Sequence, residues 1–127
     1  MKGLALAIVL AMVGLSPVLA KTDEYRILTF GCSDRVVVGR VKNGDFHPVI
    51  DPDDFLGHGW IDAELKVKRV VKGTKIGPKL QVRYFAHTYM RDDRDFMFVL
   101  TSQPDGKLLI RKGQLMSMHP RLAGQCN

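Results

Sequence analysis

The sequence predicts an all-β fold: a small five-stranded barrel, closed or partly open, with at most one short helix. Two long stretches, 60–71 and 80–86, alternate apolar and polar residues, as strands do when one face is buried. Turn-forming residues separate the shorter apolar runs, and no stretch shows a convincing helical period. A single open sheet of this size would leave exposed edges and an uncovered face, and closure into a barrel removes both.

The first twenty residues, 1–20, are expected to be a cleavable signal peptide. Lys2 is followed by an uncharged apolar run over 3–15, and small residues precede the predicted cleavage after Ala20. The run is shorter than the roughly 20 apolar residues that a membrane span needs; an uncleaved anchor is the alternative. Residues 21–127 are then a single secreted or periplasmic domain, with no integral membrane segment after cleavage and expected to be a monomer.

The chain has two cysteines, Cys32 and Cys126, which allow one intramolecular disulfide in an oxidising compartment. A closed loop of this length contributes about 4–5 kcal/mol in the chain-entropy model. That is a large share of the roughly 5–15 kcal/mol that stabilises a typical domain. The alternative is that Cys32 is a reactive thiol, but no nearby histidine or CxxC pair supports it.

The first strand is predicted over 36–41, where β-branched residues dominate. Gly39 within it indicates a bulge, a bend or a close approach of two backbones. Residues 42–59 are rich in glycine, proline and aspartate and are expected to form a long loop. Loops of that length in a compact domain are usually functional or mobile.

The second and third strands are predicted to form a hairpin. One face of the second strand collects the apolar residues Ile61, Ala63, Leu65 and Val67. Val70 and Val71 are adjacent and break the alternation, which predicts a bulge near 68–70. A glycine-containing turn over 72–78 leads to the third strand, on which Tyr84 is expected to face the core.

The fourth strand, 96–100, is continuously apolar and therefore expected to be buried on both faces. A Pro-Asp-Gly turn over 103–106 connects it to a fifth strand that begins at 108. The tail, 119–125, is expected to be irregular. If the chain forms a helix, we expect it to be short and to lie near 51–56 or 113–118.

Three segments carry a resemblance to a known family: Val36–Val41 with its Gly-Arg pair, the long strand closing on Val71-Lys72-Gly73, and Leu80–Tyr84. The pattern resembles an oligonucleotide/oligosaccharide-binding (OB) barrel of the netrin-like branch. That branch is seen in tissue inhibitors of metalloproteinases and in small exported bacterial domains. The resemblance covers roughly residues 30–115. It implies an OB-like barrel but not the inhibitors' mechanism, in which a mature N-terminal cysteine chelates the target's zinc.

Catalytic signatures are missing from the sequence. Ser33-Asp34 lies in no GxSxG or SxxK context. The four histidines are scattered without HxH or HExxH spacing, namely His47, His58, His87 and His119. The aspartates of 51–54 lack the twelve-residue calcium pattern. We therefore expect no catalysis, no metal and no cofactor; an enzyme would need an activity that depends on one of the histidines.

The favoured function is a binding module that recognises a protein or a cell-envelope component. The binding face is expected in the loops 42–59 and 87–95, because loops on a rigid barrel often carry function. The candidate partner-binding residues are Phe55, Trp60, Tyr89, Arg91 and Arg94.

The alternative function is a polyanion binder for nucleic acid, glycan or anionic lipid. The chain carries a formal net charge of +6, which favours anionic partners without choosing among them. The candidate residues on the basic outer face are Lys66, Lys68, Lys72, Lys75, Lys79 and Arg83. Salt separates the alternatives, because polyanion binding weakens steeply with ionic strength.

Overall fold

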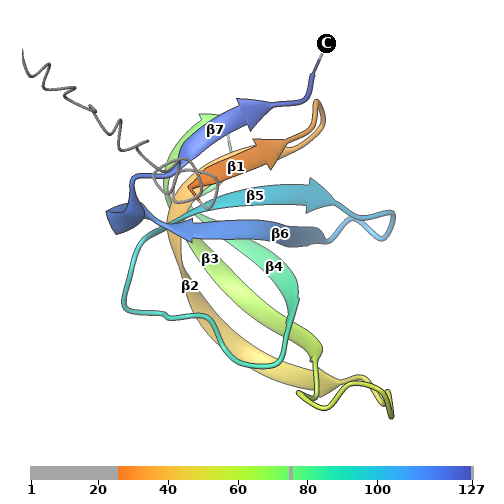
Figure 1. Ribbon diagram of the computed structural model, residues 1–127. Coiled ribbons are helices and arrows are strands. Elements are labelled where there is room, and N and C mark those ends of the chain that lie inside the picture. The colour runs from red at the N-terminus through yellow and green to blue at the C-terminus, as the bar shows by residue number, and fades with distance from the viewer. Residues whose placement is uncertain (1–25, 75, 127) are drawn as a thin grey trace, which may run out of the picture.

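The computed structural model describes residues 26–74 and 76–126, so the predicted signal peptide lies outside the described residues. In order, the elements are β1 (Ile27–Phe30), β2 (Arg35–Pro48), β3 (Gly59–Lys72), β4 (Lys79–Ala86), β5 (Phe96–Ser102), β6 (Leu108–Leu115), the 3₁₀ turn η1 (Met116–Met118) and β7 (Arg121–Gly124). The strands β2-β3-β4-β6-β5 close into a barrel in that order (Figure 1). The predicted all-β class is confirmed, and the five-stranded barrel is consistent with an OB-like fold.

The hairpin of β2 and β3 forms most of one barrel wall, and it bends where the sequence predicts a bulge. Val38 pairs with Arg69 and Gly39 with Val67, so Lys68 has no partner in the register. A Cβ on Gly39 would lie 2.3 Å from the carbonyl oxygen of Lys66. Glycine therefore lets the two backbones approach closely at the bend, as expected for a glycine inside a strand.

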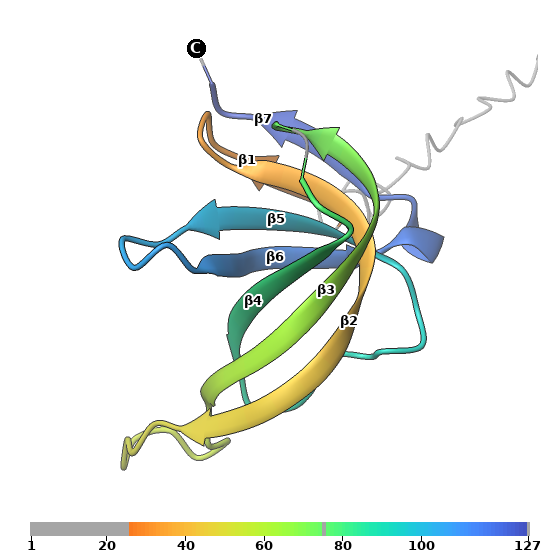
Figure 2. The ribbon, with the colours of Figure 1, turned by 180° about the vertical axis from the view of Figure 1, so that it is seen from behind.

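β2 is longer than the sequence predicts, and the prediction of a loop over 42–59 is wrong for its first part. Pairing with β3 continues from Lys42 opposite Glu64 as far as Pro48 opposite Gly59. A register shift between Asn43 and Phe46 accommodates the turn-forming residues that suggested a loop. The true loop is 49–58, and it lies at the end of a β2–β3 arm that projects from the barrel (Figure 2).

The core has two layers. The barrel interior is filled by buried side chains from all five strands, among them Val37, Ile61, Leu65, Val82, Tyr84, Phe98, Leu100 and Ile110. A second layer outside the wall contains Leu28, Val36, Val38, Met97 and Val99, with Leu122 packed against it. β5 contributes to both layers, so the prediction that this strand is buried on both faces is confirmed for residues 97–100.

The second layer is covered by β1 and β7, a parallel pair that the sequence did not predict. Ile27 pairs with Arg121 and Phe30 with Gly124, so the prediction of an irregular tail is wrong. These strands are only four residues long, too short to show a clear alternation. The predicted disulfide between Cys32 and Cys126 is confirmed, and it joins the ends of this pair.

Within residues 26–74 and 76–126, helical structure is limited to one 3₁₀ turn, as predicted. η1 lies within the segment 113–118, one of the two places where the sequence allowed a short helix. Across residues 26–74 and 76–126, no helix combines the length and the apolar character that crossing a membrane requires.

Candidate functional site

The loop 49–58, here called the tip loop, is held by its own polar groups. The Val49 amide donates to the His58 carbonyl across the base of the loop. The carboxylate of Asp54 accepts hydrogen bonds from the backbone amides of Leu56, Gly57 and His58. His58 Nδ1 lies 2.9 Å from Asp54 Oδ2. The hydrogen bond to the His58 side chain, followed by that from its amide, lowers the pKa of Asp54.

Apolar side chains on the tip loop point into solvent. Ile50 and Phe55 are each 98% exposed, and Leu56 is 64% exposed. Val49 at the base of the loop is 42% exposed. Single exposed apolar residues are ordinary on protein surfaces, but several on one structured loop make that loop a candidate interaction site.

An aromatic cluster lies at the base of the tip loop, where β3 begins and β4 ends. Trp60 pairs with Phe85 across the two strands, and their ring centroids are 5.1 Å apart. His58 stacks on Phe85 at 5.5 Å, and His87 meets the His58 ring edge-on at 5.0 Å. The guanidinium carbon of Arg83 lies 5.6 Å from the Trp60 ring centroid, a cation–π arrangement.

The start of the 87–95 loop is fixed to β2 by a buried tyrosine. Tyr84 Oη donates to the side chain of Asn43 and accepts from the Met90 amide at 2.9 Å. Asn43 also donates from Nδ2 to the Met90 carbonyl at 2.8 Å. Burial raises the pKa of Tyr84. Asn43 is a positioning residue that the sequence analysis missed, because nothing in the sequence shows which loop lies beside it.

The predicted partner-binding residues fall into two groups. Phe55 lies on the tip loop, Trp60 in the aromatic cluster, and Tyr89 is about half exposed just before Met90. Arg91 and Arg94 are not brought to the tip. They line a separate hollow with Leu115 and Ser117, and Arg91 is paired with Asp93 at 2.8 Å.

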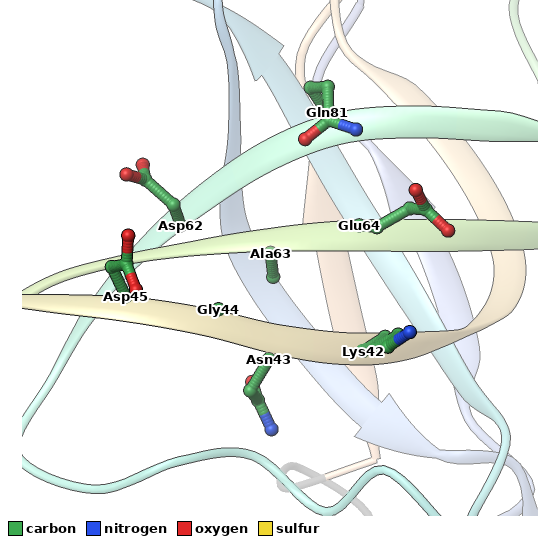
Figure 3. A pocket seen from close by; sticks show the side chains of 8 residues that line it. All are labelled: Lys42, Asn43, Gly44, Asp45, Asp62, Ala63, Glu64 and Gln81. Carbon is green, nitrogen blue, oxygen red and sulfur yellow. The ribbon is translucent and has the colours of Figure 1, made fainter.

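A polar groove runs across the outer face of β2, β3 and β4, next to the cluster (Figure 3). Its volume is about 300 Å³, and its lining includes Lys42, Asp45, Asp62, Glu64 and Gln81. Asp62 Oδ2 lies 2.8 Å from Nε2 of His47 on the β2 arm. That hydrogen bond lowers the pKa of Asp62. His47 and Asp62 were missed as a pair, because in the sequence each looks like an ordinary solvated residue.

The cations of the predicted basic face make different contacts and do not form one continuous free surface. Lys72 Nζ donates to the backbone carbonyls of Gly31, Cys32 and Asp34, so this cation supports the disulfide segment. Lys68 is bonded to Asp95 at 2.7 Å. Arg83 lies 3.5 Å from Asp62. Lys75 lies outside the described residues, and Lys66 and Lys79 remain exposed on the outer face.

Two other chemistries considered from the sequence are a metal site and a nucleophile at Ser33-Asp34. Among residues 26–74 and 76–126, no three potential metal ligands of the His, Cys, Asp or Glu type converge. Asp34, beside Ser33, is buried and accepts three side-chain and backbone hydrogen bonds, from Gly31, Thr101 and Arg111. Its contacts are those of a structural carboxylate.

The closed barrel with its projecting apolar loop is the architecture of a small β-barrel domain. Comparisons with protein-family models, with curated proteins and with solved structures found no match.

Proposed function

We propose that this protein is a non-catalytic binding module that docks onto a partner protein through the tip loop. The observation that carries the proposal is the almost complete exposure of Ile50 and Phe55 on a loop closed by its own hydrogen bonds. These side chains add nothing to the packed core. Burying each in a partner would contribute roughly 1.5–3 kcal/mol.

The charges around the tip loop favour a protein over a membrane surface. Asp45, Asp51 and Asp53 are exposed on or beside the apolar tip, although the whole chain carries a net charge of +6. Anionic lipid head groups would repel carboxylates at the point of insertion. An apolar pocket with a basic rim on a protein would complement both the side chains and the charges.

The aromatic cluster extends this surface. Trp60 and Phe85 add large aromatic side chains at the base of the tip, and aromatic residues are enriched at the buried centres of protein interfaces. Arg83 holds the Trp60 ring from one side. We expect the cluster to form the firm base of the interface while the tip loop enters the partner's pocket.

The proposal is tested by retention of a partner from cell-envelope extract on tagged, oxidised protein. The Ile50→Ser/Phe55→Ser double variant should lose a stoichiometric protein that the parent retains at both low and high salt. Met118→Ser is the matched control, because Met118 is an exposed apolar residue on η1, away from the tip loop. Equal retention by the double variant would contradict the proposal, provided that its circular dichroism matches the parent.

We also propose that the barrel is exported and is of the netrin-like type. The disulfide supports export, because such bonds persist in oxidising compartments. The Gly39-Arg40 pair on β2 and the close of β3 on Lys72-Gly73 support the netrin-like type. N-terminal sequencing of the protein from its native host should begin at Lys21, and recovery of intact Met1 would contradict signal cleavage.

A further inference from the structure

Three cations lie in one row across three neighbouring strands. Arg40 on β2 is directly opposite Lys66 on β3, and Lys66 is directly opposite Lys79 on β4. The adjacent row, Val41, Leu65 and Leu80, packs into the barrel core. Because successive side chains on a strand point to opposite faces, the three cations lie together on the outer wall.

This cation row is unfavourable for folding by itself, since like charges directly opposite each other destabilise a sheet. The neighbouring rows are arranged differently. Lys42 is opposite Glu64, and Asp62 is opposite Arg83, so both of those rows pair opposite charges. The cation row is the exception on this face of the sheet, which suggests a role other than stability.

The carboxylates nearby neutralise the row incompletely. Asp95 is shared, since it lies 3.0 Å from Arg40 Nε and 2.7 Å from Lys68 Nζ. Lys79 Nζ is 3.9 Å from Glu64, at the limit of an ion pair. Lys66 forms no ion pair within 4.0 Å with residues 26–74 or 76–126, the part of the chain that the structure describes.

The row lines an open hollow of about 360 Å³, whose other lining residues are Val41, Lys42, Glu64 and Asp92. Neighbouring strands are about 4.8 Å apart, so the three cations extend over about 10 Å. A ligand of that length with several negative charges would meet all three. Glu64 and Asp92 would accept hydrogen bonds from hydroxyl groups, which an anionic glycan offers and a bare phosphate chain does not.

We propose that Arg40, Lys66 and Lys79 form a binding site for the sulfate or phosphate esters of an anionic glycan. The site is separate from the tip loop and does not rest on the proposed docking function. The cations pair with the ester groups, while the two carboxylates at the rim select for a sugar backbone. The polar groove of Figure 3, which shares Lys42 and Glu64 with this hollow, extends the surface toward the tip.

The test is titration calorimetry of the full mature protein with dextran sulfate, and with uncharged dextran as the reference polymer. The Lys66→Gln/Lys79→Gln double variant should bind at least tenfold more weakly than the parent. Its slope of log K against log salt should be shallower by about one to two. The double variant Lys112→Gln/Arg121→Gln removes two exposed cations from β6 and β7, at residues that line neither this hollow nor the polar groove, and it should leave both values unchanged.

The glycan assignment would be overturned if Lys112→Gln/Arg121→Gln weakened binding as much as Lys66→Gln/Lys79→Gln, since diffuse charge would then explain the affinity. It would also be overturned if the parent bound phosphatidylglycerol vesicles but not dextran sulfate. Folding does not confound the comparison, because relief of like-charge repulsion should keep or raise the unfolding temperature of Lys66→Gln/Lys79→Gln. The Ile50→Ser/Phe55→Ser variant should retain dextran sulfate binding, which separates this site from the tip loop.

Discussion

At the scale of single residues, Asp34 does more for the fold than its place in the sequence suggests. Its carboxylate accepts hydrogen bonds from the Gly31 amide at 2.7 Å, Thr101 Oγ1 at 2.8 Å and Arg111 at 2.7 Å. The residue is only 7% exposed. It therefore ties the disulfide segment to β5 and β6, although in the sequence it reads as a solvated turn residue.

Replacing Asp34 by alanine should lower the free energy of unfolding by about 3 kcal/mol. The change removes hydrogen bonds to a charged group and leaves buried donors without partners. Urea unfolding monitored by circular dichroism measures the loss. Ser33→Ala is the control, because Ser33 is the exposed neighbour; an Asp34→Ala effect as small as the control's would disprove the structural role.

The same carboxylate predicts a pH dependence. Burial alone would raise the pKa of Asp34, but the hydrogen bonds from Gly31, Thr101 and Arg111 together hold it below its ordinary value of 3.8. The stability it contributes is thus fully present above about pH 4 and is lost as the pH falls through the lower, folded pKa. The difference in unfolding free energy between the parent and Asp34→Asn should shrink as the pH falls below about 4, over the range in which the parent stays folded. A difference that stays constant over that range would contradict the assignment.

At the scale of elements, the sequence predicted the strands best where apolar and polar residues alternate over many positions. The β3–β4 hairpin, the bulge at Lys68, the doubly buried β5 and the turn at 103–106 are all as predicted. The extension of β2 to Pro48 was not predictable, because cross-strand pairing outweighed the local turn signals of Gly44 and Pro48. Whether a segment with turn-forming residues continues as a strand depends on its pairing with a neighbouring strand, and that pairing cannot be inferred from a single sequence.

The bend of the β2–β3 hairpin depends on the close backbone approach at Gly39. Gly39→Ala should destabilise the protein by about 2–4 kcal/mol, because the new Cβ would clash with the Lys66 backbone at 2.3 Å. For a domain of this size, that shifts the unfolding temperature downward by about 10 °C or more. Gly77→Ala is the matched control, since no heavy atom lies within 4 Å of its added Cβ. Equal melting temperatures for the two variants would show that β2 and β3 do not approach as described.

At the scale of the whole molecule, the candidate site was predicted in part. Phe55 and Tyr89, two of the candidate partner-binding residues, are exposed, and Trp60, a third, lies in the cluster at the base of the tip. Ile50 was missed, because exposure of an apolar residue depends on where the loop projects. The cation row was predicted in part: Lys66 and Lys79 were among the candidate polyanion-binding residues. Arg40 was missed, because it becomes their neighbour only through the register of three strands.

The tip loop and a cap closed by the disulfide lie at opposite ends of the molecule (Figure 2). β1, β7 and the Cys32–Cys126 bond cover one part of the barrel, while the tip loop projects at the far end of the β2–β3 arm (Figure 2). The Cys32→Ala/Cys126→Ala variant should lose about 4–5 kcal/mol of stability in the chain-entropy model. The destabilisation should be greatest in β7, because this strand is held to the fold chiefly by β1 and by the disulfide.

Hydrogen exchange on the Cys32→Ala/Cys126→Ala variant measures how far the destabilisation spreads from the lost disulfide. Amides of β7 should exchange much faster than in the parent, while β3 and β4 amides keep their protection relative to global unfolding. Partner retention through the tip loop should be unchanged at temperatures where the barrel stays folded, because β1 and β7 lie at the opposite end of the molecule from the tip loop (Figure 2). If retention fails while the β3 and β4 amides remain protected, the cap itself takes part in binding, and the tip loop is only one side of a larger interface.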